Sequence, residues 1–380
     1  MVCMRKCMTF LLIIVLLLSV NQQAAVANND VSAKSAILIE QETGRTLYGK
    51  NEHTKMRIAS ITKIMTAIIA IESGKLEDIV DISERAIYTE GSSIHLELGD
   101  QITLKDLVYG LMLRSGNDAA VAIAEHVGGS VEGFNFLMNE KAAMIGMTNS
   151  EFSNPHGLDD HENHYSTAYD MALLTKYAME NKAFRELFET KLYHPIYKSK
   201  AWKNKHKLVT GMYSYTTGGK TGYTKRANRT LVTTAEKNGL ELIAVTLDSN
   251  SNDWNDHISM FETGFDQYNL INIFGQDNLE MVKDEFYKNK IFVERDVLYP
   301  LNKEEENEVN VAVQLIKPQK SWKKNKDVPT IIGKVVISLS DDTIEEIPVF
   351  YDHGNRKSKK SWWPIFSQVF AMIIGVNSDG

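Results

Sequence analysis

The feature that most constrains this chain is a nearly continuous apolar stretch over residues 58–71. It predicts a helix that begins at Ser60 and ends near Gly74, and apolar residues on almost every face indicate that this helix is buried. Ser60 and Lys63 are three residues apart, so their side chains lie on the same face. Burial and the positive end of the helix would both lower the pKa of Lys63, so an uncharged amine could take the proton of the Ser60 hydroxyl.

The same pair also has a purely structural interpretation, because serine is a favoured helix N-cap and a lysine in the first turn is ordinary. The Ser-x-x-Lys pattern recurs at Ser321–Lys324, in a polar stretch that is typical of a linker. The pattern therefore gains its weight only from the motifs that follow it along the chain.

Two further motifs follow in order. Ser115-Gly116-Asn117 lies in a tight connection between two apolar helical segments, and Lys220-Thr221-Gly222 lies in a predicted strand. Alone, the first could be a turn and the second a strand edge with a glycine bulge. Because the three motifs occur together, each on a suitable element, they indicate acyl transfer by an activated serine.

The chemistry of acyl transfer assigns a role to each of the first four residues. Ser60 would attack a carbonyl carbon and form an acyl-enzyme, and Lys63 would receive the serine proton. Ser115 would relay a proton to the leaving amine, because a hydroxyl can both donate and accept. Asn117 would hold Lys63 and a substrate amide through hydrogen bonds.

The strand motif would bind the end of the substrate. Lys220 would add a second positive charge, which lowers the pKa of the proposed base and attracts an anionic substrate end. Thr221 could bind a carboxylate, and Gly222 would let a substrate backbone lie against the strand. The backbone N–H groups of Ser60 and Tyr223 are expected to hold the oxyanion.

The order of the predicted elements indicates an α+β fold, in which helices pack on an antiparallel sheet. A hairpin opens the chain, helices fill the middle, and two strong strands joined by an Asn238-Gly239 turn follow. From residue 276 the pattern changes to short alternating strands without a helix signal, which predicts a second, small all-β domain. The predicted strands are 35–40, 45–48, 79–82, 229–235, 240–248, 290–297, 308–315, 334–339 and 344–351, and the predicted helices are 103–113, 119–127, 132–145, 169–180 and 254–268.

Residues 1–27 are typical of a secretory signal peptide. Arg5 and Lys6 precede an apolar run over residues 10–20 that is too short to span a bilayer comfortably, and Ala25-Val26-Ala27 fits a cleavage site. An uncleaved anchor is the alternative. Both cysteines lie in this segment, so the mature chain would have no disulfide, thiol nucleophile or cysteine metal site.

The other end of the chain is typical of a membrane anchor. Basic residues between 356 and 360 precede an apolar segment with paired tryptophans, 361–374, which predicts an amphipathic helix at the headgroup boundary. A terminal helix packed on the protein body is the alternative. The predicted boundaries are 1–27 for the signal peptide, 28–275 for the catalytic domain, 276–352 for the β-rich domain and 353–380 for the basic linker and anchor.

Other classes of partner are disfavoured. The net charge of −7 provides no general basic surface, so nucleic acid is not an expected partner. His156, His161 and His164 could bind zinc, but their spacing differs from the helix-borne His-x-x-x-His pattern. We interpret these histidines as part of a polar loop at the rim of the cleft, and expect no metal and no cofactor.

Over nearly the whole mature sequence, the chain resembles the serine-type D-alanyl-D-alanine carboxypeptidases, which are low-molecular-mass penicillin-binding proteins. The resemblance rests on the three motifs and on residues 114–119, 154–158 and 219–222. It implies a β-lactamase/transpeptidase-like fold, removal of the terminal D-alanine from the stem pentapeptides of peptidoglycan muropeptides, and acylation of Ser60 by β-lactam inhibitors such as penicillin. The family usually has proline where this chain has Ile58, which changes entry to the helix rather than the chemistry.

Within the family, the chain looks most like the sporulation-associated members of endospore-forming bacilli, which trim cortex peptidoglycan. Three other functions remain to be weighed. A β-lactamase would need a glutamate-oriented water, and no Glu-x-x-Leu-Asn stretch follows the Ser115 motif. A zinc-dependent D,D-peptidase would use the histidines as ligands, and a non-catalytic murein-binding module would not need all three motifs.

Overall fold

The computed structural model describes residues 31–354, apart from 197–199 and 323. It divides into two compact units, the first ending at Asn269 and the second beginning at Leu270. The predicted signal peptide and the predicted C-terminal helix lie outside the described residues. No helix in the described part of the chain is both long enough and apolar enough to cross a membrane.

The first unit is built on a five-stranded antiparallel sheet with the strand order β2-β1-β9-β8-β7. Asn238 and Gly239 both have positive φ, so the β8–β9 hairpin has the tight turn that the sequence predicts. β7 forms one edge of the sheet. The strands are β1 (Ser35–Glu40), β2 (Thr46–Lys50), β7 (Thr216–Thr224), β8 (Asn228–Lys237) and β9 (Leu240–Ser249).

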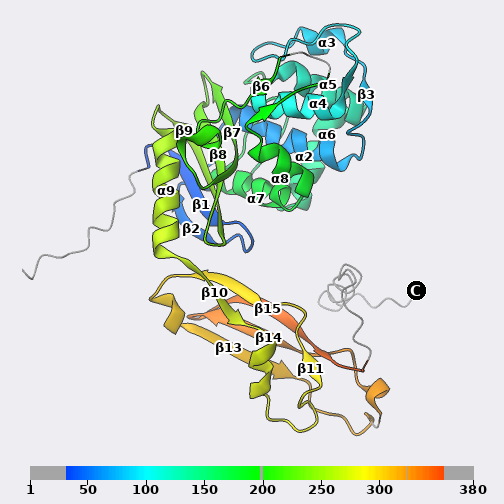
Figure 1. Cartoon of the computed structure of the whole chain (residues 1–380), viewed down its shortest axis with the longest axis vertical. Coiled ribbons are helices and arrows are strands. Elements are labelled where there is room, and N and C mark those ends of the chain that lie inside the picture. Colours follow the sequence, from blue (N-terminus) through cyan, green and yellow to red (C-terminus); the bar gives the residue numbers. More distant parts are fainter. Residues whose placement is uncertain (1–30, 197–199, 323, 355–380) are drawn as a thin grey trace, which may run out of the picture. The chain divides into compact units, whose positions relative to one another are not determined.

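Helices cover both faces of this sheet (Figure 1), which confirms the predicted α+β fold. The last helix, α9 (Asp253–Gln267), packs on β8 and β9 on one side, and the other helices lie on the opposite side. Those helices are α2 (Lys63–Glu72), α3 (Glu84–Ile87), α4 (Leu104–Tyr109), α5 (Asn117–Gly128), α6 (Val131–Met144), α7 (Ala168–Met179) and α8 (Lys182–Glu189). Two short strand pairs lie between them: β3 (Ile79–Val80) with β4 (Ile102–Thr103), and β5 (Leu192–Tyr193) with β6 (Trp202–Lys203).

The apolar stretch at 58–71 forms the centre of the larger core, as predicted. Every residue of α2 from Lys63 to Ile71 is buried, and the helix contacts α4, α5, α6, α7 and α8. Its first turn differs from the prediction, because residues Ala59–Thr62 form a 3₁₀ turn, η1, and the α-helix begins only at Lys63. The tighter turn brings side chains three residues apart into line.

Two further helices differ from the expected segments. The helix predicted for 103–113 is capped by Thr103, whose Oγ1 accepts from Asp106 N at 3.1 Å, but α4 ends at Tyr109. A π-helical turn, η2 (Gly110–Arg114), follows and leads to Ser115 in a left-handed conformation, with φ 64°. Helix α8 was not predicted. A second π-helical turn, η3 (Leu208–Met212), precedes β7.

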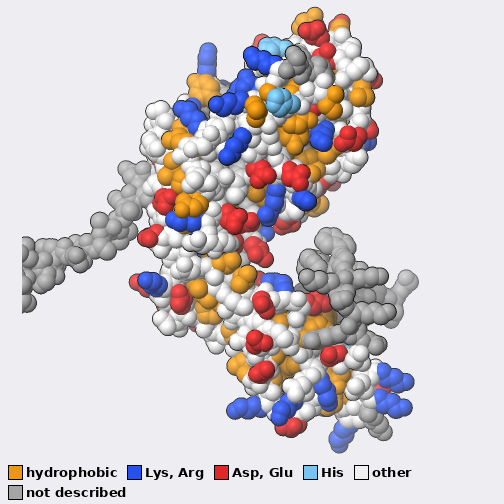
Figure 2. Space-filling model, viewed as in Figure 1, with side chains coloured by type: hydrophobic (Ala, Val, Ile, Leu, Met, Phe, Trp, Pro, Cys, Tyr) orange, Lys and Arg blue, Asp and Glu red, His pale blue; other side chains and the backbone are white. Residues whose placement is uncertain are grey.

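The second unit contains two sheets around a core of its own, which confirms the predicted all-β domain. The strand predicted for 290–297 is wrong: the charged segment 294–296 separates β11 from β12, which join different sheets. Charged side chains of both signs lie on its surface (Figure 2). The four-stranded sheet has the order β11 (Ile291–Phe292), β15 (Asp342–Tyr351), β14 (Ile331–Leu339), β13 (Val309–Leu315). In the two-stranded sheet, β10 (Asn269–Phe274) pairs with β12 (Val297–Leu301). The 3₁₀ turns are η4 (Gln276–Met281), η5 (Glu305–Asn307) and η6 (Asn325–Asp327).

Candidate active site

Ser60 and Lys63 lie at the junction of η1 and α2, and the structure brings their side chains together. Lys63 Nζ donates to Ser60 Oγ at 3.0 Å. The Ser60 side chain is partly exposed, whereas Lys63 has no exposed surface. A hydroxyl that a ligand can reach is therefore placed over an amine that solvent cannot reach.

Two further acceptors surround the Lys63 amine. Asn117 Oδ1 accepts from Nζ at 2.7 Å, and the backbone carbonyl of His156 accepts at 2.6 Å. Burial lowers the pKa of Lys63 well below its ordinary value, the positive charges of Lys220 and Lys205 lower it further, and Asp118 opposes the shift. Burial and the charge of Lys220, two of the effects expected from the sequence, thus act on this amine.

Ser115 and Asn117 come from the turn between α4 and α5. The side-chain amide of Asn117 donates to the carbonyl of Glu90 at 2.6 Å, which fixes its oxygen toward Lys63. The neighbouring Asp118 carboxylate accepts from the backbone N–H of Ile94 at 3.0 Å and of Leu96 at 3.2 Å. The loop beside the site is therefore held by the same turn that carries the motif.

Lys220 lies on β7 at the edge of the sheet, and it contacts the second serine. Its Nζ donates to Ser115 Oγ at 3.1 Å and to the carbonyl of Thr221 at 2.7 Å. Burial, and then the charge of Lys205, lower the pKa of Lys220 to about 7. Two hydrogen-bonded pairs, Ser60 with Lys63 and Ser115 with Lys220, thus face one site.

The remaining residues of the strand motif have different surroundings. Thr221 is partly buried and Tyr223 is 64% exposed, so both are accessible to a ligand. A Cβ atom on Gly222 would lie 2.3 Å from Thr230 Oγ1 and 2.9 Å from Ser60 N. The structure therefore gives this glycine a role that the sequence did not suggest: it allows β7 to lie against the turn that carries Ser60.

The turn before Ser60 is held in an unusual conformation. Ala59 has φ 47°, a left-handed value that costs about 1–3 kcal/mol for a residue with a side chain. Its carbonyl accepts from Thr62 Oγ1 at 2.8 Å and lies against Gly157, where a Cβ atom would approach this oxygen to 1.9 Å. Gly157 also has φ 86°, so both its conformation and its contact with Ala59 require glycine.

We expect the Gly157→Ala substitution to reduce acylation of Ser60 by about 10²-fold, because Ala59 must move and the nucleophile moves with it. The control is Gly146→Ala, which has a similar φ of 83° but no atom within 4 Å of the added Cβ. The rate of labelling by a fluorescent penicillin measures the effect. Equal losses in the two variants would assign the effect to backbone conformation alone.

The loop with the predicted histidines contributes hydrogen bonds rather than a cluster of ring nitrogens. His164 Nε2 lies 2.9 Å from Thr62 Oγ1, and His156 Nδ1 accepts from Leu158 N at 3.2 Å. Burial first, and then nearby positive charges, lower the pKa of both rings to about 3. Within the described residues, no three His, Cys, Asp or Glu side chains lie close enough to hold a metal ion.

Some important groups were not identified from the sequence. The carbonyl of His156 is a backbone group that any residue could supply, and only the loop motif at 154–158 pointed to this segment. Asp118 was visible only as a neighbour of the second motif. Lys205 is exposed, its Nζ lies 3.4 Å from Ser92 Oγ, and no feature of the sequence distinguishes it from the other lysines.

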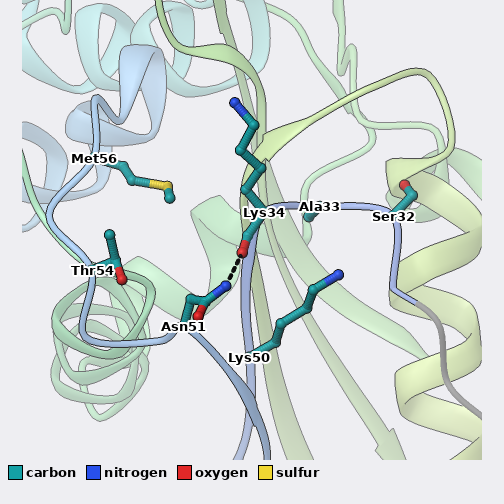
Figure 3. A pocket seen from close by; sticks show the side chains of 7 residues that line it. All are labelled: Ser32, Ala33, Lys34, Lys50, Asn51, Thr54 and Met56. Carbon is teal, nitrogen blue, oxygen red and sulfur yellow. Dashed lines mark hydrogen bonds between the residues drawn. The ribbon is translucent and has the colours of Figure 1, made fainter.

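A hollow of about 350 Å³ lies elsewhere on the first unit, beside the start of β1 and the end of β2 (Figure 3). Asn51 Nδ2 donates to the carbonyl of Lys34 across it at 2.9 Å, and the Lys34 ammonium pairs with Asp248 at 2.7 Å. None of the residues of the three motifs lines this hollow. It is therefore separate from the constellation described above.

Comparison with known proteins matches both units. The family model of D-alanyl-D-alanine carboxypeptidase matches residues 21–251, and that of the penicillin-binding protein 5 C-terminal domain matches 270–354. D-alanyl-D-alanine carboxypeptidase DacF of Bacillus subtilis (strain 168) is 33% identical over 346 residues, 86% of each chain. D-alanyl-D-alanine carboxypeptidase DacC of Escherichia coli (strain K12) is 35% identical over 237 residues, 57% of this chain and 56% of that protein. The crystal structure of penicillin binding protein 5 from Haemophilus influenzae has a TM-score of 0.70 and 26% identity, and the match covers 85% of this chain and 97% of that one.

Proposed function

The chain belongs to the D-alanyl-D-alanine carboxypeptidase family, and we propose that Ser60 and Lys63 are the nucleophile and base with which it acts. The enzyme is a serine-type D-Ala-D-Ala carboxypeptidase, a hydrolase of peptidoglycan stem peptides. One observation supports the assignment of roles above all others: Lys63 Nζ lies 3.0 Å from Ser60 Oγ, while its other polar contacts are both acceptors.

The count of hydrogen atoms at Lys63 explains how it can act as a base. An uncharged amine has two N–H groups and one lone pair. The acceptors Asn117 Oδ1 and the His156 carbonyl take both N–H groups, so the lone pair is left for the hydroxyl proton of Ser60. The lowered pKa of Lys63 favours this uncharged form.

Acylation then forms a bond between Ser60 Oγ and the carbonyl carbon of the penultimate D-alanine. Lys63 takes the serine proton as this bond forms, and the C–N bond to the terminal D-alanine breaks. The leaving amine takes a proton from Ser115 Oγ, which is replaced by one from Lys220 at 3.1 Å. The products of this step are free D-alanine and an ester on Ser60.

Deacylation reverses these proton transfers with water as the nucleophile. Water attacks the ester carbon, the pair Ser115 and Lys220 takes the proton of the water, and Lys63 returns its proton to Ser60. We assign the oxyanion to the backbone N–H groups of Ser60 and Tyr223, because the absence of a Cβ atom at Gly222 lets β7 lie against the turn at Ser60. We assign the terminal carboxylate to Thr221 and Lys220.

We also propose the biological process in which the enzyme acts and its location in the cell. The likeness to a Bacillus subtilis relative over 86% of each chain supports a role in trimming cortex peptidoglycan during sporulation. The sequences of residues 1–27 and 361–374 support secretion and attachment to the outer face of the cytoplasmic membrane. Penicillin and other β-lactams would acylate Ser60 in the same manner as the peptide.

Intact-protein mass spectrometry after incubation with a pentapeptide muropeptide or with penicillin tests this function. We expect release of one D-alanine per peptide, and a penicillin adduct on Ser60 that persists for many minutes and is absent from Ser60→Ala. Rapid turnover of penicillin without a persistent adduct would instead favour a β-lactamase. Loss of peptide hydrolysis after chelation of metal ions would favour a zinc-dependent peptidase.

A further inference from the structure

The four-stranded sheet of the second unit separates charge along its strands. At one end, where β13 begins and β14 turns into β15, the side chains are acidic: Glu304, Glu305, Glu306, Glu308, Asp341 and Asp342. This end is closed by Ser340, whose N–H donates to the carbonyl of Glu308 at 3.2 Å. Acidic side chains therefore gather at the turn side of the sheet, while Glu345 and Glu346 lie along β15 and Asp327 and Asp352 lie at the opposite end.

The opposite end carries a basic segment, residues 316–326, that follows β13. It contains Lys317, Lys320, Lys323, Lys324 and Lys326 and no acidic residue. Those of the five that the structure describes are exposed, and none of their ammonium groups makes an ion pair with a described residue. Figure 2 shows Lys and Arg side chains gathered at the lower end of this unit.

Packing contacts hold the basic segment on the body of the unit. The Tyr287 hydroxyl donates to the carbonyl of Ile316 at 2.5 Å, and the Tyr351 hydroxyl donates to Asn325 Oδ1 at 3.3 Å. The rings of Trp322 and Phe286 lie 6.0 Å apart. The described lysines are therefore carried by a segment that packs on the unit, with the partly exposed Trp322 and the 44% exposed Ile316 among them.

The chain leaves the second unit at the same end. Asp352 N donates to the carbonyl of Lys290 at 2.7 Å, and His353 Nδ1 lies 3.0 Å from the carbonyl of Asn325. The residues that follow in the sequence are Arg356, Lys357, Lys359 and Lys360, and then the apolar segment 361–374. The basic segment and the last described residues of the chain thus share one end of the sheet.

We propose that the described lysines of the basic segment, Lys317, Lys320, Lys324 and Lys326, form a second membrane-binding element, which binds the phosphate headgroups of anionic lipids when the predicted C-terminal anchor is inserted. The proposal rests on the membrane attachment proposed above. β13 is seven residues long, so about 23 Å separate its two ends. This exceeds the Debye length of about 8 Å, and the acidic end therefore does not cancel the attraction of the basic end.

The charge pattern favours a membrane over a soluble ligand. Lysines next to a tryptophan and an exposed isoleucine match the composition of segments that lie at the headgroup boundary. The last described residues lie beside them, and the predicted apolar tail begins seven residues further along the sequence, so an inserted tail would hold the lysines near the surface. One amphipathic helix alone attaches reversibly, and a second basic contact would strengthen the attachment.

The test compares full-length variants on vesicles of phosphatidylcholine alone and of phosphatidylcholine with 30% phosphatidylglycerol. The test variant carries Lys317→Gln, Lys320→Gln, Lys324→Gln and Lys326→Gln. A matched control makes the same charge change on exposed lysines of the first unit: Lys75→Gln, Lys105→Gln, Lys182→Gln and Lys200→Gln. A third variant, Trp362→Ser with Trp363→Ser, weakens the tail.

At about 0.1 M salt we expect the test variant to bind the anionic vesicles about one to two orders of magnitude more weakly than the unmodified chain. Its binding to neutral vesicles should not change, and the control variant should bind like the unmodified chain. Equal losses in the test and control variants would overturn the proposal, because net charge alone would then explain binding. An unchanged test variant would also overturn it.

The remaining measurements separate this proposal from the proposed tail anchor and from the proposed catalytic function. Failure of the tryptophan variant to lose binding would overturn the tail anchor, yet a remaining salt-dependent contribution of the four lysines would still support the second contact. Binding of the lysines to soluble polyphosphate but not to anionic vesicles would refute the membrane as their partner. Penicillin labelling of Ser60 should be equal in all variants, and its absence from the unmodified chain would count against the catalytic proposal alone.

Discussion

Lys63→Ala should reduce the rate of acylation of Ser60 by penicillin about 10³- to 10⁴-fold, because the substitution removes the general base. Among the described residues, Lys63 Nζ is the side-chain base that contacts Ser60 Oγ, at 3.0 Å. The rate should stay low across the pH range, since no group remains whose deprotonation restores it. Stopped-flow labelling with a fluorescent penicillin from pH 5 to pH 10 provides the measurement.

The loss must be separated from damage to the fold, because Lys63 is fully buried and its removal leaves Asn117 Oδ1 and the His156 carbonyl without a donor. Each unsatisfied acceptor costs about 1–3 kcal/mol. Lys141→Ala is the matched control: Lys141 of α6 pairs with Glu72 of α2 at 2.7 Å, outside the site. A lower melting temperature with normal labelling is expected there. Unchanged labelling of Lys63→Ala would refute its role as the base.

Features of the fold that depend on local sequence could be predicted. The buried helix α2 follows from apolar residues on all faces, the β8–β9 hairpin from Asn238-Gly239, and the start of α4 from the cap at Thr103. The π-helical turn at Gly110–Arg114 could not be predicted. Its extra residue lets Ser115 N reach the carbonyl of Gly110, and packing around the site selects this pattern over an ordinary helix.

In the candidate site, too, some features could be predicted from the sequence and others could not. Its side-chain motifs could be predicted because serine, lysine and asparagine at fixed spacing have a chemical meaning, and the structure places Ser60, Lys63 and Asn117 within hydrogen-bond distance. The carbonyl of His156 had no such signal, since every residue has a carbonyl. Lys205 influences both buried lysines only through its position in the fold, which composition and spacing do not encode.

Lys220→Gln should lower kcat/KM for a peptide substrate about 10²- to 10³-fold, since it removes a buried charge that is hydrogen-bonded to Ser115 at 3.1 Å. A neutral amide of similar length preserves much of the packing around β7. The control is Lys237→Gln on β8, whose partly exposed ammonium pairs with Glu262 at 3.6 Å away from the site. This control should keep its activity.

The pH dependence distinguishes loss of charge from loss of packing. The pKa of Lys220 is about 7, so its charge is fully present well below pH 7 and is lost as the pH rises through this value. In the unmodified enzyme, kcat/KM should therefore decline on the alkaline side with an apparent pKa near 7, because this parameter reports the free enzyme. A bound carboxylate would hold the proton on Lys220, so the decline should be weaker in kcat.

In Lys220→Gln this alkaline decline should disappear. The acidic limb should move to higher pH, because the positive charge of Lys220 lowers the pKa of Lys63 and its removal lets that pKa rise. A pH profile with the same shape as that of the unmodified enzyme, at a uniformly reduced rate, would assign the limbs to other groups and leave Lys220 only a structural contact. Both limbs belong to a coupled pair of lysines, so they must be compared between the variants as a set.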